Sequence, residues 1–324
     1  MIELERPSRN IGLDVVRVTE TAALAAGRWV GSGDYNAAHR AATRAMRAAL
    51  DTLPMDGRII IGEENRLGED LHLCGGEPVG TGDGLQVDIV VDPIDGTNLL
   101  IQGQPGSVSV LGVAPRDTLF SPIPAEYMNK LVVDKEAANA IVPECLDAPA
   151  AWTLALIARV KHKAVRDLSV IVLDRPRNED LVEEIRSTGA RVLLRQEGDA
   201  EGSLIAASVG TGVDALMGIG GTAQGIMAAL VVKALGGAML ARVAPQSKEE
   251  MQAIQESDLN LNKIYTCNDL VKTNQIFFAA TGITNTHLLD AMQFHREYAS
   301  THSLLIRSET GTRRYIYAEH YARI

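Results

Sequence analysis

Residues 168–195, LSVIVLDRPRNEDLVEEIRSTGARVLLR, decide the fold class of this chain. The apolar run at 168–174 is typical of a buried strand, and the stretch at 177–189 has the apolar spacing of a helix that Gly189 closes. A second apolar run, at 190–195, indicates another strand. Strand, helix and strand in this order predict a parallel pair of strands joined by a helix.

The same alternation continues further along the chain. VDALMGIGG, at 213–221, predicts a strand, and TAQGIMAALVVKALG, at 222–236, predicts the helix that follows it. We therefore expect the second half of the chain to form a mostly parallel sheet with helices on both of its faces. We therefore predict the fold class α/β (α+β), with an α/β arrangement in the second half of the chain.

The first half of the chain has a different order of predicted helices and strands. Helical spacing predicts one helix at 13–30 and a second one capped at its start by Asp34, and strands are expected at 58–62, 107–114 and 130–134. A chain of 324 residues is of a length for two domains. The order of predicted strands and helices changes between the two halves, and this change predicts an α+β domain over 1–160 and an α/β domain over 161–324.

Composition excludes several classes of function. The formal net charge of −10 argues against non-specific nucleic-acid binding, which requires a basic surface. We see no apolar run long enough for a membrane span and no signal-like N-terminus, so we expect a cytoplasmic protein without a membrane partner. The three cysteines, Cys74, Cys145 and Cys267, have neither disulfide-framework nor zinc spacing and are interpreted as reduced thiols.

A strand-like run at 87–91 leads directly into DPIDGT, which places the carboxylates of Asp92 and Asp95 three residues apart. A turn of this kind can aim both carboxylates at one point, and Mg²⁺ prefers such oxygen ligands. The backbone amides of Gly96 and Thr97 and the Thr97 hydroxyl are suited to receive a phosphate oxygen. As an isolated match, however, the pattern is more typical of a turn with capping residues.

Glu63 supplies a third carboxylate at the end of another predicted strand. It follows the apolar run at 58–62, about thirty positions before Asp92. A Gly-Glu-Glu loop by itself is more typical of a solvated turn. Two neighbouring strands that both end in acidic residues nevertheless predict a divalent-metal site at one edge of a sheet.

At this point the chain resembles a known family. The segments GSGDYNAAH, IIIGEEN, VDPIDGTNL, LDRPRNEDL, EGDAEGSLIAA, MGIGGTAQGIMAA, FFAATGIT and THSLLIRSETGTRRYI are similar, in order and spacing, to class II fructose-1,6-bisphosphatases. That family includes cyanobacterial enzymes that also accept sedoheptulose-1,7-bisphosphate. The resemblance covers residues 12–320, and DPIDGT is shared with the wider lithium-sensitive phosphatases, which include inositol monophosphatases. It implies a layered αβαβα fold.

The resemblance also implies a reaction. It implies a phosphatase that hydrolyses the 1-phosphate of fructose-1,6-bisphosphate with water activated by Mg²⁺ or Mn²⁺, held by the first domain, while the second domain binds the sugar. The matching metal ligands are Glu63, Asp92, the carbonyl of Ile94 and Asp95. Thr97 matches the residue that orients the water, so Thr97, Asp92 and Glu63 are the catalytic candidates. Family members assemble as homo-oligomers, so a dimer or tetramer is expected.

Residues beyond the metal site match the family's contacts with the sugar and its distal phosphate. Arg175 and Arg177 follow a strand where a parallel sheet opens its ligand crevice, and guanidinium groups suit a phosphate that is held rather than cleaved. A solvated loop that pairs with Glu179 and Asp180 is the alternative. The full set of expected substrate contacts is Asp95, Gly96, Thr97, Tyr127, Arg175, Pro176, Arg177, Glu197, Gly198, Asp199 and Gly221.

Several positions depart from the family pattern. Tyr35 stands where the family has Lys, and His39 where it has an Asp associated with the metal site. Leu67 lies where the family has an Asp soon after the Gly-Glu motif, and Gln224 replaces a Glu that binds metal in the family. His39 and Gln224 are therefore doubtful metal ligands, because imidazole and amide groups bind Mg²⁺ less well than carboxylates do. His39 would favour Mn²⁺ or Zn²⁺, unless it only packs on its helix.

Three functions follow from these observations. The first is an active sugar-bisphosphate phosphatase, supported by Glu63 and DPIDGT. The second is a catalytically weakened paralogue with a binding or regulatory role, supported by His39 and Gln224. The third is an inositol-phosphate-like phosphatase, suggested by Asp95 at a position where class II enzymes usually carry Glu.

Overall fold

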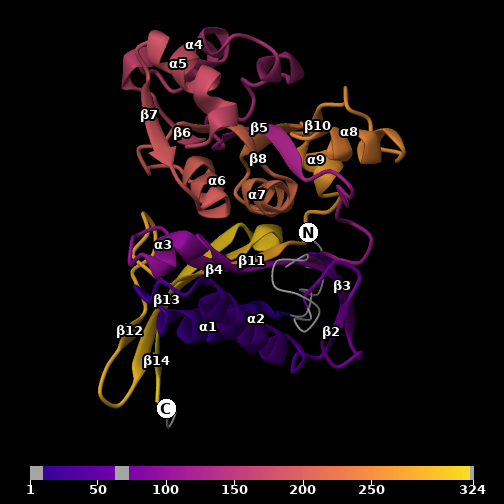
Figure 1. Cartoon of the computed structure of the whole chain (residues 1–324), viewed down its shortest axis with the longest axis vertical. Helices are drawn as coiled ribbons and strands as arrows, with labels where there is room; N and C mark the ends of the chain where they lie inside the picture. Colours follow the sequence, from indigo (N-terminus) through magenta and orange to yellow (C-terminus); the bar gives the residue numbers. More distant parts are fainter. Residues whose placement is uncertain (1–9, 63–72, 322–324) are drawn as a thin grey trace, which may run out of the picture.

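The structure is a computed structural model that describes residues 10–62 and 73–321. Helices and sheets alternate in five layers (Figure 1), which confirms the αβαβα arrangement. One helical layer covers the outer face of the first sheet, a second lies between the sheets, and a third covers the second sheet. In that order the layers contain α1 (Gly12–Gly27) and α2 (Tyr35–Leu50), α6 (Asp199–Ala207) and α7 (Thr222–Ala234), and α4 (Ala150–Val160) and α5 (Glu179–Ser187).

The first sheet has eight strands, and strands from both ends of the chain form it. Its order is β12-β13-β11-β4-β3-β1-β2, with β14 paired to β13. Only β1 and β3 run parallel to each other; the other pairs are antiparallel. The strands are β1 (Met55–Ile61), β2 (Pro78–Val79), β3 (Leu85–Asp95), β4 (Val108–Pro115), β11 (Phe277–Gly282), β12 (Gln293–Phe294), β13 (Ala299–Arg307) and β14 (Thr312–His320).

The second sheet has six strands in the order β10-β9-β5-β8-β6-β7. Parallel pairing is confirmed for β6 with β7 and with β8, where strand and helix alternate along the chain. Antiparallel pairing joins β5 to β8 and β9, and β9 to β10, so the sheet is mixed rather than mostly parallel as predicted. The strands are β5 (Tyr127–Val133), β6 (Ser169–Leu173), β7 (Arg191–Arg195), β8 (Ala215–Gly221), β9 (Ala238–Val243) and β10 (Tyr265–Thr266).

Membership of the two sheets does not follow the predicted division of the chain at residue 160. Strand β5 precedes that position and lies in the second sheet, whereas β11 to β14 follow it and complete the first sheet. The division into domains 1–160 and 161–324 stays a prediction. None of the helices in the described residues is long and apolar enough to cross a membrane.

Helix α7 is buried between the two sheets because it is apolar on nearly all of its surface. Glycines permit its close approach on both sides. A Cβ on Gly112 of β4 would lie 2.6 Å from Leu230 Cδ1 of α7, and a Cβ on Gly225 of α7 would collide with Met128 of β5. The position of α7 brings its first residues, and those of the neighbouring α6, to the space between the sheets.

The predicted N-cap of the second helix is confirmed. The Asp34 carboxylate accepts a hydrogen bond from the backbone N–H of Ala37 at 2.9 Å, which satisfies one of the unpaired donors of the first turn of α2. We expect Asp34→Ala to lower the free energy of unfolding by about 1 kcal/mol. Urea denaturation measures this change, and Asp34→Ser, which keeps a capping oxygen, is the control expected to retain most of the stability.

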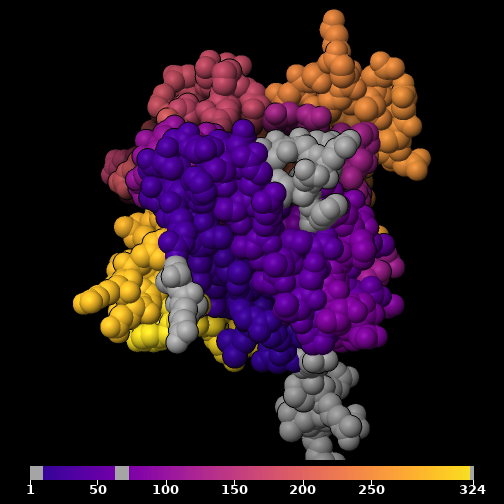
Figure 2. Space-filling view, turned by 60° about the horizontal axis from the view of Figure 1, so that its bottom comes forward, coloured from indigo at the N-terminus to yellow at the C-terminus, as the bar shows by residue number. Residues whose placement is uncertain are grey.

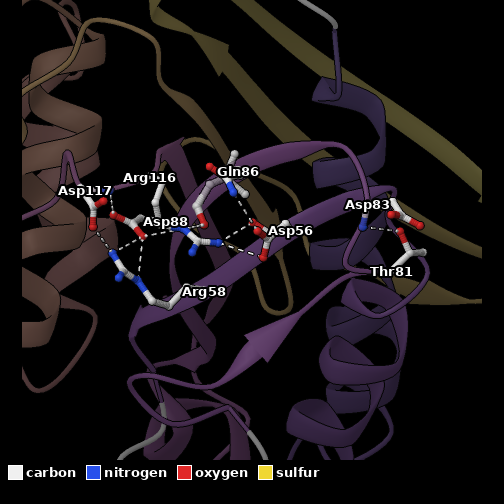
Figure 3. Close-up of polar contacts among 9 residues, drawn as sticks. Asp56, Arg58, Thr81, Asp83, Gln86, Asp88, Arg116 and Asp117 are labelled. Carbon is white, nitrogen blue, oxygen red and sulfur yellow. Dashed lines mark hydrogen bonds and ion pairs between the residues drawn. The ribbon is translucent and has the colours of Figure 1, made fainter.

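A network of charged side chains holds the beginning of β3 to its neighbours (Figure 3). Asp88 is fully buried and accepts hydrogen bonds from Arg58 Nε at 3.0 Å and Nη2 at 2.8 Å. It also accepts one from the backbone N–H of Asp117 at 2.6 Å. Arg116 binds the Asp56 carboxylate at 3.0 Å. This network lies on β1, on β3 and on the two residues that follow β4, and it contributes no residue to the cleft described below.

Candidate active site

A cleft of about 710 Å³ lies between the two sheets. The last residues of β3 and the turn that follows them line one wall, and the ends of β5, β6, β7 and β8 line the other. Most of the residues predicted from the sequence meet here, although their roles remain predictions. The predicted site residues that line the cleft are Asp92, Ile94, Asp95, Gly96, Thr97, Tyr127, Arg175, Arg177, Glu197, Gly198, Asp199, Gly221 and Gln224. Tyr35, which was noted only as a departure from the family pattern, lines it as well.

Three predicted residues are not among the cleft-lining positions. Pro176 lies between Arg175 and Arg177, where it begins a short 3₁₀ turn, and it does not line the cleft. His39 is fully buried within α2, so the structure does not bring it to the cleft. Glu63, like Leu67, lies outside the described residues.

The last residues of β3 and the turn at Gly96 fix the two aspartates. The pairing of β3 with β4 shifts register between Asp92 and Asp95, and the Asp92 carboxylate accepts a hydrogen bond from the N–H of Ile94 at 3.1 Å. Gly96 has a φ of +90°, a conformation that favours glycine, and α3 (Thr97–Ile101) begins directly after it. The Thr97 hydroxyl donates to the carbonyl of Ile94 at 3.1 Å. The backbone therefore points both carboxylates toward the cleft.

The charge on this wall is poorly balanced. Asp92 and Asp95 are 6% and 5% exposed. Burial raises the pKa of Asp95 well above its ordinary value, and the Asp92 carboxylate adds to the effect; a hydrogen bond from the Glu201 N–H at 3.0 Å opposes it. The charges of Asp199 and Glu201 raise the pKa of Asp95 further. A hard divalent cation fits this wall, because it takes oxygen ligands and would relieve the repulsion between them.

The ligand set for such a cation is incomplete in the described residues. Across 10–62 and 73–321, no group of three or more His, Cys, Asp or Glu side chains is close enough to hold a metal ion. Asp92, Asp95 and the carbonyl of Ile94 are the oxygen donors that the described part of the wall offers. Glu63 is the further ligand expected from the sequence.

The opposite wall presents cationic and aromatic groups. The guanidinium of Arg177 lies 4.7 Å from the centroid of the Tyr127 ring, and its Nε donates to the carbonyl of Ile219 at 3.1 Å. Arg175 is half-buried, lines the cleft, and its Nη1 donates to the carbonyl of Asp174 at 2.9 Å. These contacts orient Arg177 while its terminal nitrogens remain available as donors to an anion.

Two buried residues that support this wall were missed by sequence reasoning. Asn178 donates to the carbonyls of Leu173 and Ile219 at 3.0 and 3.1 Å and accepts from the Ile219 N–H at 2.8 Å, so it ties β6 to β8. Lys130 is only 1% exposed and donates to Asp199 Oδ2. A Cβ on Gly220 would lie 2.8 Å from Lys130 Nζ, so only glycine fits beside this pair.

Asp199 is the one site carboxylate with a buried cationic partner among the described residues around the cleft. Its second oxygen, Oδ1, is buried and has no hydrogen-bond partner in the described structure. A buried acceptor without a partner is unfavourable unless a ligand supplies a donor. Asp199 itself lines the cleft, so Lys130 fixes a carboxylate at this wall.

Glu197 connects the two walls. One of its carboxylate oxygens accepts from the backbone N–H of Asn98 at 2.9 Å, and the other accepts from the Asn98 side-chain amide. Because Asn98 lies in α3 and Glu197 precedes α6, this contact joins the turn after β3 to the second sheet. Glu197 was predicted to contact the sugar; in the structure both of its oxygens already accept hydrogen bonds.

Comparison with known proteins agrees with this geometry. The family model described as bacterial fructose-1,6-bisphosphatase, glpX-encoded, matches residues 9–320. The chain belongs to this family. A curated relative, the fructose-1,6-bisphosphatase class 2 of Haemophilus influenzae, is 39% identical over 97% of both chains. The D-fructose 1,6-bisphosphatase class 2/sedoheptulose 1,7-bisphosphatase of Synechococcus sp. (strain JA-3-3Ab) is 35% identical over 94% of both.

Two solved structures that resemble this chain do so weakly. The extragenic suppressor protein suhB of Bartonella henselae has a TM-score of 0.34 and 12% identity, over 62% of this chain and 73% of that chain. An inositol monophosphatase of Zymomonas mobilis has a TM-score of 0.32 and 18% identity, over 61% of this chain and 74% of that chain. Similarity at this level carries no argument about the site.

The positions that depart from the family pattern make contacts of their own. Gln224 Nε2 lies 3.4 Å from Asp92 Oδ2 and donates a hydrogen bond to it. The His39 ring stacks on Tyr35 with centroids 5.8 Å apart, and its Nδ1 lies 3.4 Å from the Thr43 hydroxyl. The altered Gln224 thus touches a predicted metal ligand, whereas the altered His39 takes part in packing at the start of α2.

Proposed function

We propose that this chain is a metal-dependent phosphatase that hydrolyses the 1-phosphate of fructose-1,6-bisphosphate, with sedoheptulose-1,7-bisphosphate as a second substrate. The buried pair Asp92 and Asp95 carries the proposal, because it faces a cleft whose opposite wall bears Arg175 and Arg177. A bisphosphate needs one end where phosphorus is attacked and another where phosphate is only held. Membership of the family and the 35–39% identity to curated class 2 enzymes support the same substrate class.

Mg²⁺ or Mn²⁺ would be held by Asp92, Asp95 and the carbonyl of Ile94, with Glu63 as the further expected ligand. When bound, such an ion lowers the pKa of water and neutralises charge on the transferring phosphoryl group. Thr97 donates its hydroxyl proton to Ile94, so its oxygen lone pairs are left to accept a hydrogen bond from the attacking water. The N–H groups of Gly96 and Thr97 can receive a phosphate oxygen, whereas that of Asn98 already donates to Glu197.

The second wall would position the sugar. Arg175 and Arg177 donate to the distal phosphate, and the contacts of Arg177 with Tyr127 and Ile219 limit the side-chain entropy lost on binding. Asp199 Oδ1 accepts a hydrogen bond from a sugar hydroxyl, and Lys130 holds the carboxylate in place and compensates its charge. Correct placement of the phosphorus beside Thr97 then lowers the barrier by fixing orientation.

A catalytically weakened paralogue is the second candidate, and the contact between Gln224 and Asp92 favours it. A neutral amide that donates to Asp92 Oδ2 competes with a cation for that oxygen and contributes no charge of its own. In this case the cleft would still bind the sugar phosphate. An inositol phosphate is a further substrate to test, because Asp95 replaces the usual Glu of the family.

Phosphate release from fructose-1,6-bisphosphate with Mg²⁺ or Mn²⁺ tests these candidates. We expect turnover by the unmodified chain and a loss of about 10³-fold in Asp92→Asn, because a carboxylate–cation contact is worth about 4 kcal/mol near a protein surface. Gln224→Glu is expected to raise Mn²⁺ affinity in calorimetry, since it returns a carboxylate to the cleft. The double variant His39→Asp with Gln224→Glu restores the family's acidic residues at both positions.

Two outcomes would contradict the main proposal. Turnover that appears only when both family residues are restored favours the weakened paralogue. Hydrolysis of an inositol phosphate in preference to the sugar bisphosphate favours the third candidate. Gln224→Asn, which adds no carboxylate, is the control and should not give the gain in Mn²⁺ affinity expected of Gln224→Glu.

We propose, further, that the chain acts in the cytoplasm as a homo-oligomer, a dimer or tetramer, with a sugar bisphosphate as its ligand. Membership of the family supports this proposal.

A further inference from the structure

Strand β14 forms a long free edge of the first sheet. All nine of its residues pair with β13 without a bulge, and in the described structure it pairs with no other strand. It contains no proline. Figure 1 shows it extending at the margin of the molecule, beyond the helices that cover the rest of the sheet. An edge of this kind presents unpaired N–H and C=O groups to any strand that can pair with it.

One face of β14 is exposed and carries aromatic and charged groups. Arg313, Tyr315, Tyr317 and Glu319 alternate along the strand and are all exposed, the two tyrosines by 54% and 64%. Figure 2 shows the segment that carries β12 to β14 (yellow) projecting beside the N-terminal helices. Tyrosine is enriched at protein interfaces because its ring offers apolar area and its hydroxyl remains hydrated.

The strand is complementary to itself when two copies pair antiparallel about Ile316. In that register Arg313 faces Glu319 of the second copy, at both ends of the ladder, and Tyr315 faces Tyr317 of the second copy. A shift of two residues shortens the ladder and leaves the charges opposite tyrosines. A shift of one residue sets the exposed face of one copy against the opposite face of the other.

Within one copy the two charges cannot meet. Arg313 and Glu319 are separated along β14 by about 20 Å, since a strand rises about 3.4 Å per residue. Glu319 does accept a hydrogen bond from the Tyr321 hydroxyl at 2.7 Å, which leaves its other oxygen available. Arg313 and Glu319 can therefore pair with each other only across two molecules.

We propose that β14 is the docking surface for a second copy of this chain, paired antiparallel about Ile316 so that the first sheets of two copies become continuous. The backbone ladder and the facing tyrosines supply the affinity. The two exposed ion pairs select the register, because complementary charges give specificity more than affinity.

Sedimentation of charge-reversal variants tests this inference. Arg313→Glu and Glu319→Arg each place like charges opposite one another at two points, and each is expected to raise the dimer dissociation constant about tenfold or more. The double variant exchanges the two charges and is expected to restore the dissociation constant. Arg314→Glu is the matched control, because Arg314 faces Ala318 of the second copy and its reversal should change little.

Cross-linking gives a second test of the register. Ile316 lies on the two-fold axis and faces itself, so Ile316→Cys is expected to form a disulfide-linked dimer under mild oxidation. Ala318→Cys, displaced from the axis, should not. The inference is overturned if the unmodified chain sediments as a monomer, if single charge reversals leave association unchanged, or if the double variant does not recover. These readouts are independent of phosphatase activity, since β14 contributes nothing to the cleft.

Discussion

Asp95→Asn is expected to make the metal-free protein more stable while it removes phosphatase activity. Asp95 is buried beside Asp92, so its negative charge is unfavourable in the absence of a cation. Asparagine keeps an oxygen that can accept the hydrogen bond from the Glu201 N–H. We expect a gain of about 1 kcal/mol in the free energy of unfolding, measured in chelator, and a loss of phosphate release of about 10³-fold with Mg²⁺.

The pH dependence of this difference has a definite sign. Because burial and the Asp92 charge raise the pKa of Asp95 above its ordinary 3.8, the folded state binds the proton more tightly than the unfolded state. The free energy of unfolding of the original protein therefore falls as pH rises from about 3.8 through the folded pKa. The asparagine variant lacks this loss. Equal stability of the two proteins at neutral pH would contradict the argument.

Asp88→Asn is the matched control for Asp95→Asn. Asp88 is an equally buried aspartate on the same strand, but its carboxylate is bound by Arg58 and by the N–H of Asp117. The same substitution is here expected to lower the free energy of unfolding by about 2 kcal/mol, because it weakens the charge-assisted hydrogen bonds from Arg58, a side chain that is 34% exposed. Activity per folded molecule should remain, since this network does not line the cleft.

The sequence predicted those parts of the fold that depend on local pattern. Apolar spacing indicated α1, α2, α5 and α7, and the alternation of strands and helices predicted the parallel pairing of β6 with β7 and β8. It did not predict that β5 enters the second sheet or that β11 to β14 return to the first. An apolar run identifies a strand, but its partners are chosen by packing between distant segments, which periodicity does not encode.

The same distinction holds for the site. DPIDGT and DRPR were found because each motif places two side chains of the same charge close together after a predicted strand: two carboxylates in the first and two guanidinium groups in the second. Lys130 was missed because a single lysine in a strand normally points to solvent; its role depends on Asp199, 69 residues further along the chain. Gly220 gave no signal either, because its closeness to this pair arises only when β8 lies beside β5.

Lys161→Met is expected to destabilise the protein by about 3–5 kcal/mol, the largest change in stability that we predict. The ammonium of Lys161 lies 2.7 Å from Asp134 Oδ2 and 3.1 Å from Asp214 Oδ1, and all three side chains are no more than 4% exposed. Methionine preserves the length of the side chain but leaves Asp134 without a cation and Asp214 with only Lys163. Denaturant unfolding at neutral pH measures the change.

Lys163→Met separates this buried pairing from an ordinary surface contact. Lys163 binds the same Asp214 at 2.7 Å but is 37% exposed, so its loss should lower the free energy of unfolding by no more than about 1 kcal/mol. Similar losses of unfolding free energy in both variants would mean that burial of Lys161 does not strengthen its ion pairs.

The effect of Lys161→Met should also be confined to a pH window. Burial by itself would raise the pKa of Asp214, but hydrogen bonds from Lys163, the Ser169 N–H and Lys161 lower it below its ordinary 3.8. Burial likewise opposes the charge of Lys161, yet Asp134 and Asp214 raise the pKa of this lysine above 10.5. The stabilisation is therefore present between about pH 4 and 10 and is lost as pH falls through the folded pKa of Asp214 or rises through that of Lys161. A difference between Lys161→Met and the original protein that persists unchanged at pH 2 would show that packing, not charge, accounts for it.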